Sequence, residues 1–250
     1  MQNALLDTLS AVRQSLRAPQ SSDCRSTGER HGSARPILLV HGFASNTAML
    51  APLARHLTRR LRRKVIRVPL SAGRDDLRRS AGELQRVVED QAARRGFEYA
   101  DIVGHSMGGL TATYVLKKLD RGRRVRSVVT LGTPHRGTPL AQLGVLALGK
   151  ASRAVWQMVP GSSLVRELRT LEAPKGSRVI SIAGDRDWLV PSRWSRLAER
   201  AQHRNLLLPG LSHTALLVAR GALERVAVEL APAPVSEAAG APSGPLGLAA

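Results

Sequence analysis

Ser106 has the setting that most clearly indicates chemistry, because it is the centre of Gly-x-Ser-x-Gly in the stretch Val103-Gly104-His105-Ser106-Met107-Gly108. The apolar run before it predicts a strand and residues 110–119 after it predict a helix, so the serine lies on a strand-to-helix turn. Such a tight, strained turn requires small residues two positions away on either side, and Gly104 and Gly108 meet that need. A serine held at a helix start, where free N–H groups favour negative charge, is suited to act as a nucleophile.

A serine nucleophile needs a base and an acid that orients the base. His213, the last of the seven histidines, follows the last predicted strand and opens the final predicted helix. His203 is a weaker candidate, because it precedes that strand. Asp185 and Asp187 both follow the fifth predicted strand, and the spacing Gly-x-x-Asp-x-x-Val-Pro selects Asp187 as the acid. Asp185 is expected to brace the loop or to pair with Arg186.

Acyl transfer at this serine also needs two donors for the oxyanion. The backbone N–H of Met107, directly after the nucleophile, is one candidate. The second is the backbone N–H of Phe43, in the turn His41-Gly42-Phe43 that follows the first core strand.

The elements that must position these groups alternate between short apolar runs and longer helical stretches, which is the pattern of an α/β fold with a mostly parallel central sheet and helices on both faces. About six strands are expected, at 37–40, 65–69, 99–103, 125–131, 178–183 and 205–208. Helices are expected at 46–61, 76–94, 110–119 and 213–230.

The remaining segments divide the chain around one catalytic domain, residues 36–230. Residues 1–35 predict an amphipathic helix followed by a polar linker, and residues 231–250 predict a disordered tail. An apolar insertion at about 137–173 is interpreted as a helical lid over the carboxyl ends of the strands. The alternative for this insertion is that it extends the core.

The formal net charge of +19 favours anionic partners, but its make-up argues against nucleic acid. Only five of the 38 basic residues are Lys, the arginines are spread over helical segments, and aromatic residues make up only 3% of the chain. Little is therefore available for base stacking. Weak contact with an anionic membrane surface stays open. With a single cysteine, Cys24, and no apolar stretch of signal or membrane-spanning length, a cytoplasmic location is expected.

With these parts placed, the chain resembles the α/β-hydrolase superfamily, and most closely its bacterial triacylglycerol lipase and esterase branch. The stretch Gly132-Thr133-Pro134-His135-Arg136-Gly137 is similar to the Gly-Thr-Pro-His-x-Gly segment of those lipases. The resemblance covers roughly residues 36–230. It implies ester hydrolysis through a serine acyl-enzyme with no organic cofactor, and it places His135 near the pocket rather than as the base.

The sequence therefore predicts a lipase or esterase that acts on esters of apolar acyl groups, with the triad Ser106, Asp187 and His213 and no metal site. Three alternatives stay open: a thioesterase, an amide hydrolase with the same triad, and a protein that binds anionic surfaces through its arginines. The secreted members of the branch carry a signal sequence and a disulfide, which are missing here, so action on insoluble fat is not implied.

Overall fold

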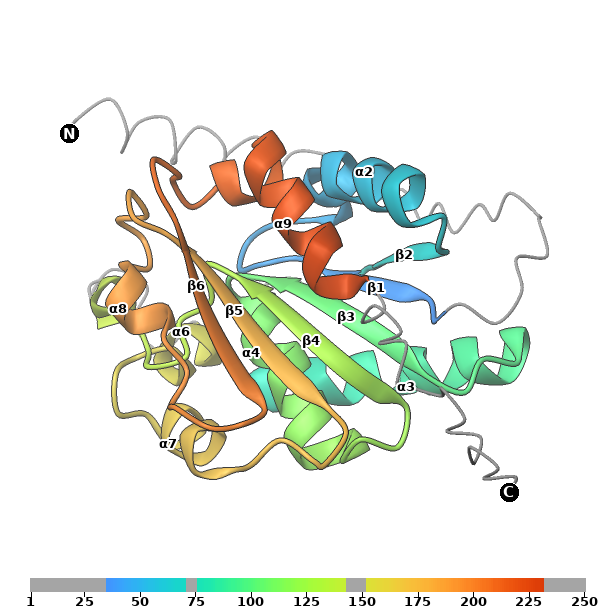
Figure 1. Cartoon of the computed structure of the whole chain (residues 1–250). Helices are drawn as coiled ribbons and strands as arrows, with labels where there is room; N and C mark the ends of the chain where they lie inside the picture. The colour runs from blue at the N-terminus through green and yellow to red at the C-terminus, as the bar shows by residue number, and fades with distance from the viewer. Residues whose placement is uncertain (1–34, 71–75, 143–151, 232–250) are drawn as a thin grey trace, which may run out of the picture.

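The computed structural model describes residues 35–70, 76–142 and 152–231. Within them lies a parallel sheet in the order β2-β1-β3-β4-β5-β6 (Figure 1). Its strands are β1 (Ile37–Val40), β2 (Val65–Val68), β3 (Ala100–His105), β4 (Val125–Leu131), β5 (Arg178–Gly184) and β6 (His203–Leu208). The prediction of a parallel six-stranded sheet is confirmed.

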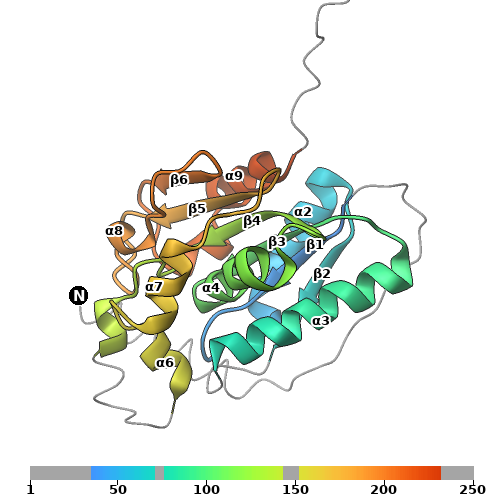
Figure 2. The same ribbon diagram turned by 90° about the horizontal axis from the view of Figure 1, so that it is seen from below.

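Helices cover both faces of the sheet, as the pattern predicted (Figures 1 and 2). The α-helices are α2 (Ala51–Leu61), α3 (Leu77–Arg95), α4 (Met107–Tyr114), α6 (Arg153–Gln157), α7 (Ser163–Thr170), α8 (Ser192–Ser195) and α9 (Arg220–Leu230). The described ranges also contain the 3₁₀ segments η1 (Thr47–Leu50) and η4 (Ala215–Leu217) and the π-helical segment η2 (Val115–Asp120).

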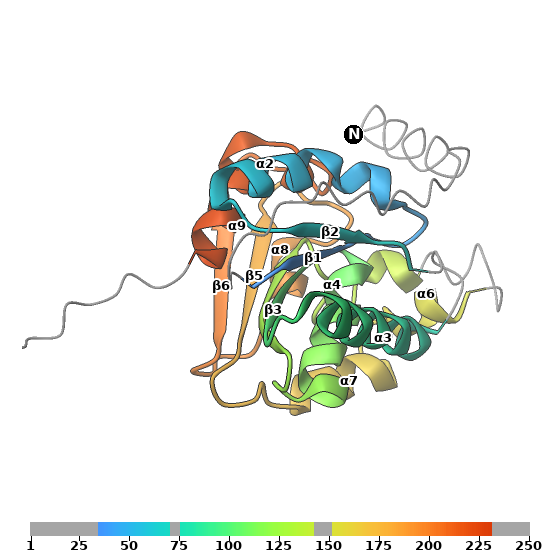
Figure 3. The ribbon, with the colours of Figure 1, turned by 90° about the vertical axis from the view of Figure 1, so that its right-hand side faces the viewer.

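The central strands β1, β3, β4 and β5 are largely apolar because both of their faces are buried, whereas the edge strands β2 and β6 are only partly buried. In β1, Leu38 and Val40 join the cluster under α3 and α4, whereas Ile37 and Leu39 join the cluster under α2 and α9. The edge-on view in Figure 3 shows α2 and α9 on one side of the strands and α3 and α4 on the other. Since all strands run parallel, their carboxyl ends meet at one edge, where Ser106, Asp187 and His213 follow β3, β5 and β6.

Three predicted boundaries were wrong. The helix after Ser106 begins at Met107 and changes to the π-helical η2 at Val115. Strand β6 begins at His203, so this histidine opens the strand rather than preceding it. The final helix begins at Arg220 rather than at His213, because the intervening residues form the tight η4 turn, in which the Leu217 N–H donates to the Thr214 carbonyl.

Within the described residues of the insertion, helices α6 and α7 pack on the core. The apolar side chains Val155, Met158, Leu164 and Leu168 belong to the cluster under α3 and α4. This packing agrees with the alternative interpretation, in which the insertion extends the core. Residues 143–151 of the predicted lid, the predicted N-terminal helix and the predicted tail beyond Ala231 lie outside the described residues.

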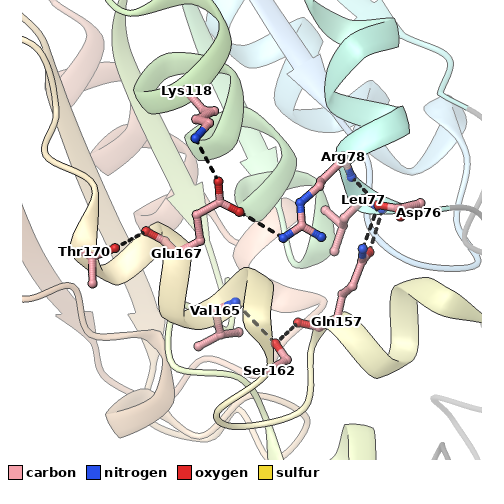
Figure 4. A network of polar contacts seen from close by, with 9 residues as sticks. All are labelled: Asp76, Leu77, Arg78, Lys118, Gln157, Ser162, Val165, Glu167 and Thr170. Atoms are coloured by element: carbon pink, nitrogen blue, oxygen red, sulfur yellow. Dashed lines mark hydrogen bonds and ion pairs between the residues drawn. The ribbon is translucent and has the colours of Figure 1, made fainter.

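Polar contacts fasten the same two helices to α3 and η2 (Figure 4). The Gln157 side chain accepts from the Leu77 N–H at 2.7 Å and donates to Asp76 at 2.6 Å, so it caps the start of α3. Glu167 of α7 pairs with Arg78 at 2.9 Å and with Lys118 at 3.3 Å. Desolvation raises the pKa of Glu167, but the hydrogen bonds from these two cations outweigh it and leave the pKa below its ordinary value. No helix in the described ranges is long and apolar enough to cross a bilayer.

Candidate active site

Ser106 sits on the strained turn that the sequence predicted. Its backbone has φ +53° and ψ −125°, a region that non-glycine residues rarely adopt. Close approach of the surrounding backbone explains the flanking glycines, because a Cβ at Gly104 would lie 2.5 Å from the Gly108 carbonyl oxygen. A Cβ at Gly108 would in turn overlap the His41 carbonyl oxygen. The turn therefore locks β3, α4 and the end of β1 together.

Asp187 and His213 meet through a hydrogen bond of 2.7 Å between Oδ2 and Nδ1, and both side chains are buried. The other carboxylate oxygen of Asp187 accepts from the Val190 N–H at 2.8 Å, which fixes its orientation. With Nδ1 of His213 donating to Asp187, Nε2 is the ring nitrogen that can take a proton.

Asp185 has the bracing role that was expected for it, since its Oδ1 accepts from the Gly210 N–H at 2.6 Å. This bond ties the loop after β5 to the loop that carries His213. The competing histidine, His203, pairs with Val179 at the start of β5, the opposite end of the strand from Asp187. Its Nδ1 donates to the Ala198 carbonyl at 2.9 Å, so His203 is not placed to serve as the base.

His105 packs beneath the base. Its Nε2 lies 3.2 Å from the His213 carbonyl oxygen, and the two rings have centroids 4.6 Å apart. Burial, together with the neighbouring His213, lowers the pKa of His105 to about 3, and burial also lowers the pKa of His41. His105 is therefore neutral at neutral pH and places no positive charge beside His213.

The two predicted oxyanion donors lie at the same edge of the sheet. Met107 is the first residue of α4, where backbone N–H groups have no acceptor within the helix. Phe43 lies in the turn after β1 and packs against the cluster that also holds Met107. Their role as donors stays a prediction.

A family model described as the PGAP1-like alpha/beta domain matches residues 84–215, more than half of the chain. The chain belongs to this family. The matched residues include Ser106, Asp187 and His213, which follow the carboxyl ends of β3, β5 and β6 in the PGAP1-like domain.

Two relatives, each a "Triacylglycerol lipase", are 35% identical over 118 residues, or 42% of this chain. They come from Pseudarthrobacter phenanthrenivorans and Burkholderia plantarii, and the match covers 35% and 31% of their own lengths. The PGAP1-like chain thus spans about a third of the relatives it matches.

Among solved structures, the mature lipase BlEst2 of Bacillus licheniformis superposes with a TM-score of 0.69 at 16% identity, covering 82% of this chain and 96% of that one. A monoacylglycerol lipase of Paleococcus ferrophilus gives 0.60 at 17% identity, with 78% and 93% covered. At these identities the likeness concerns the fold, and it confirms that the PGAP1-like domain has the α/β-hydrolase fold.

Two residues that the sequence analysis gave no role, Gly132 and Thr133, contact the triad directly. Gly132 has φ +54°, and a Cβ there would lie 2.9 Å from both Asp187 Oδ2 and His213 Nδ1. The Thr133 hydroxyl donates to the Ser106 carbonyl at 2.9 Å. A glycine immediately after a strand, at the edge where ligands bind, was the available signal for this contact.

His135, which the resemblance placed near the pocket, is buried and bonds Thr130 at 3.0 Å rather than a triad residue. Burial, with Lys117 and His203 nearby, lowers its pKa to about 3. His135 therefore has a structural contact, a hydrogen bond to Thr130 of β4. Among the described residues, no group of three or more His, Cys, Asp or Glu side chains could hold a metal ion.

Proposed function

We propose that this chain is a serine hydrolase that cleaves carboxylic esters of apolar acyl groups, with Ser106 as nucleophile. The observation that carries the proposal is the buried Asp187–His213 hydrogen bond of 2.7 Å at the sheet edge where Ser106 occupies its strained turn. A neutral serine hydroxyl needs such an oriented base to attack an ester. The family match and the relatives named as triacylglycerol lipases support the same reaction class.

In the proposed reaction, Nε2 of His213 removes the Ser106 proton as Oγ bonds to the ester carbonyl carbon. The carbonyl oxygen becomes an oxyanion that the Met107 and Phe43 N–H groups hold. When the intermediate collapses, the C–O bond to the alcohol breaks and protonated His213 gives its proton to the leaving oxygen. Water then attacks the acyl-enzyme with His213 again as base, which releases the carboxylic acid and restores Ser106.

The proposed preference for apolar acyl groups rests on the apolar cluster to which Met107, the residue directly after the nucleophile, belongs. Met107 and Met158 belong to the same buried cluster, and Phe43 and Val159 pack against it while remaining partly exposed. An acyl chain that entered beside Ser106 from this side would meet apolar surface, which favours burial of hydrocarbon by about 0.8 kcal/mol per CH₂.

The test is hydrolysis of nitrophenyl esters of increasing acyl length by the wild type and by Ser106→Ala, His213→Ala and Asp187→Asn. The wild type is expected to cleave the esters, the first two variants to lose the activity, and Asp187→Asn to lose about 10⁴-fold in kcat, as when the acid of such a triad is replaced. Asp185→Asn is the matched control, because an asparagine oxygen can still accept from the Gly210 N–H.

Other outcomes separate the alternatives. One such outcome is cleavage of thioesters or amides but not of esters, with the activity still lost in Ser106→Ala. That result would change the proposed substrate class but support the same triad. If no acyl substrate is cleaved and the chain binds anionic vesicles with steep salt dependence unaffected by Ser106→Ala, the proposal fails in favour of surface binding.

A further inference from the structure

The carbonyl oxygen of Ser106 accepts two hydrogen bonds. One comes from the Gly109 N–H at 3.0 Å, the ordinary contact within the first turn of α4. The other comes from the Thr133 hydroxyl at 2.9 Å, from the segment that follows β4. The second bond therefore joins the nucleophile's own backbone to a different strand of the sheet.

This bond acts on the oxyanion site because of the geometry of the peptide group. The Ser106 C=O and the Met107 N–H belong to one planar trans unit, in which they point in opposite directions. Whatever fixes the carbonyl also fixes the direction of the N–H proposed to hold the oxyanion. Ser106 is strained at φ +53° and ψ −125°, so rotation of this peptide would relax it and turn the N–H away.

From these contacts we infer that Thr133 is a positioning residue that holds the Met107 N–H in its oxyanion-binding direction. The inference rests on the proposed function. Thr133 touches neither substrate nor the reacting atoms, and it acts only through the Ser106–Met107 peptide.

The packing around Thr133 fits this role. Its side chain is fully buried, and a Cβ at Gly109 would overlap the Thr133 hydroxyl oxygen. Gly109, the second glycine after Met107, thus leaves the space through which the hydroxyl reaches the Ser106 carbonyl. The Gly-x-Ser-x-Gly-Gly and Gly-Thr-Pro-His stretches meet at this hydrogen bond.

The test compares Thr133→Val, which keeps the shape and removes the hydroxyl, with Thr133→Ser, which keeps the hydroxyl. Thr113→Val is the matched control, since the Thr113 hydroxyl is also buried and donates to a helix carbonyl, that of Gly109, at 2.7 Å. Both valine variants lose one buried hydroxyl-to-carbonyl bond. Only Thr133→Val releases the oxyanion peptide.

The expected result for Thr133→Val is a kcat about 10-fold lower with KM within about twofold, less than the loss of an entire donor because the N–H remains. Its affinity for an alkyl boronic acid, which forms a tetrahedral adduct with the serine, is expected to fall by a similar factor. Thr133→Ser and Thr113→Val are expected to stay within about threefold of the wild type in both measurements. If Thr133→Val does not fold, Thr133→Cys, with its weak donor, is expected to have a kcat below that of Thr133→Ser.

The inference is overturned if Thr133→Val keeps the wild-type kcat, if Thr113→Val loses as much, if boronate affinity is unchanged, or if Thr133→Cys matches Thr133→Ser. These results all presuppose an active wild type. A wild type that neither cleaves esters nor binds the boronate at Ser106 contradicts the proposed function instead.

Discussion

Replacement of Gly132 by alanine tests whether the Asp187–His213 pair lies where the structure has it. The added methyl would lie 2.9 Å from Asp187 Oδ2 and from His213 Nδ1, and 3.1 Å from His213 Cε1. Ordinary contacts of a carbon atom lie at about 3.5–4.0 Å, so the pair or the end of β4 has to move by roughly half an ångström. The methyl therefore presses on the 2.7 Å hydrogen bond that orients the base.

Two separate effects are expected from Gly132→Ala. Alanine at φ +54° costs roughly 1–2 kcal/mol in conformation alone, and the added contact costs about 1–3 kcal/mol. A misplacement of about 1 Å in an active site costs on the order of 10²-fold in rate. A half-ångström shift of the pair is therefore expected to lower kcat by at most about 10-fold.

Gly176→Ala separates these effects. Gly176 also has a left-handed backbone, at φ +75°, but its nearest neighbour for a new Cβ is Arg126 Nη1 at an ordinary 3.5 Å. It precedes β5, at the opposite end of the strand from Asp187. Urea unfolding and ester hydrolysis of both variants are measured. Both variants should lose stability, and only Gly132→Ala should lose kcat. Equal kcat values in the two variants would mean that the methyl at position 132 does not displace the Asp187–His213 pair.

Two further predictions concern stability. Arg63 is buried and donates to the Leu230 carbonyl at 2.7 Å and to the Asp101 carboxylate. Arg63→Met would leave this carboxylate buried without its cation, so it should lower the free energy of unfolding by about 3–5 kcal/mol. Urea unfolding checks this, and a loss below about 1 kcal/mol would contradict it. His105 and His135 keep pKa values of about 3 in the folded state, against an ordinary histidine value of 6.5, so the unfolded chain binds more protons as the pH falls below 6.5. Stability should then fall by about 1.4 kcal/mol per pH unit for each histidine down to about pH 3. His135→Gln should make the dependence shallower, and an unchanged slope would argue against a neutral buried His135.

The sheet could be predicted from the sequence because its central strands are apolar and buried on both faces, and the order Ser106, Asp187, His213 because each residue follows a predicted strand. The π-helical η2 could not. Its residue Lys117 donates to the carbonyls of Leu168 and Leu171, in and just after α7, at 3.2 and 3.0 Å, contacts with a segment about 50 residues further along the chain. Burial lowers the pKa of Lys117 to about 8, which is a consequence of packing that periodicity cannot express.

The site residues that the sequence left without a role depend on close approach in space. A glycine at position 132 is visible in the sequence, but the Asp187–His213 pair that leaves no room for a Cβ there lies on the loops after two other strands. The final helix was extended too far for a similar reason. Its apolar spacing continues back toward His213, whereas the chain there must turn so that the His213 ring reaches Asp187.

Activation of Ser106 by His213 can be measured by reaction with a fluorophosphonate, with the adduct located by peptide mass spectrometry. A single adduct on Ser106 is expected, which forms at the wild-type rate in Asp185→Asn and far more slowly in His213→Ala. Ester hydrolysis without an adduct on Ser106, or equally fast labelling in His213→Ala, would contradict it.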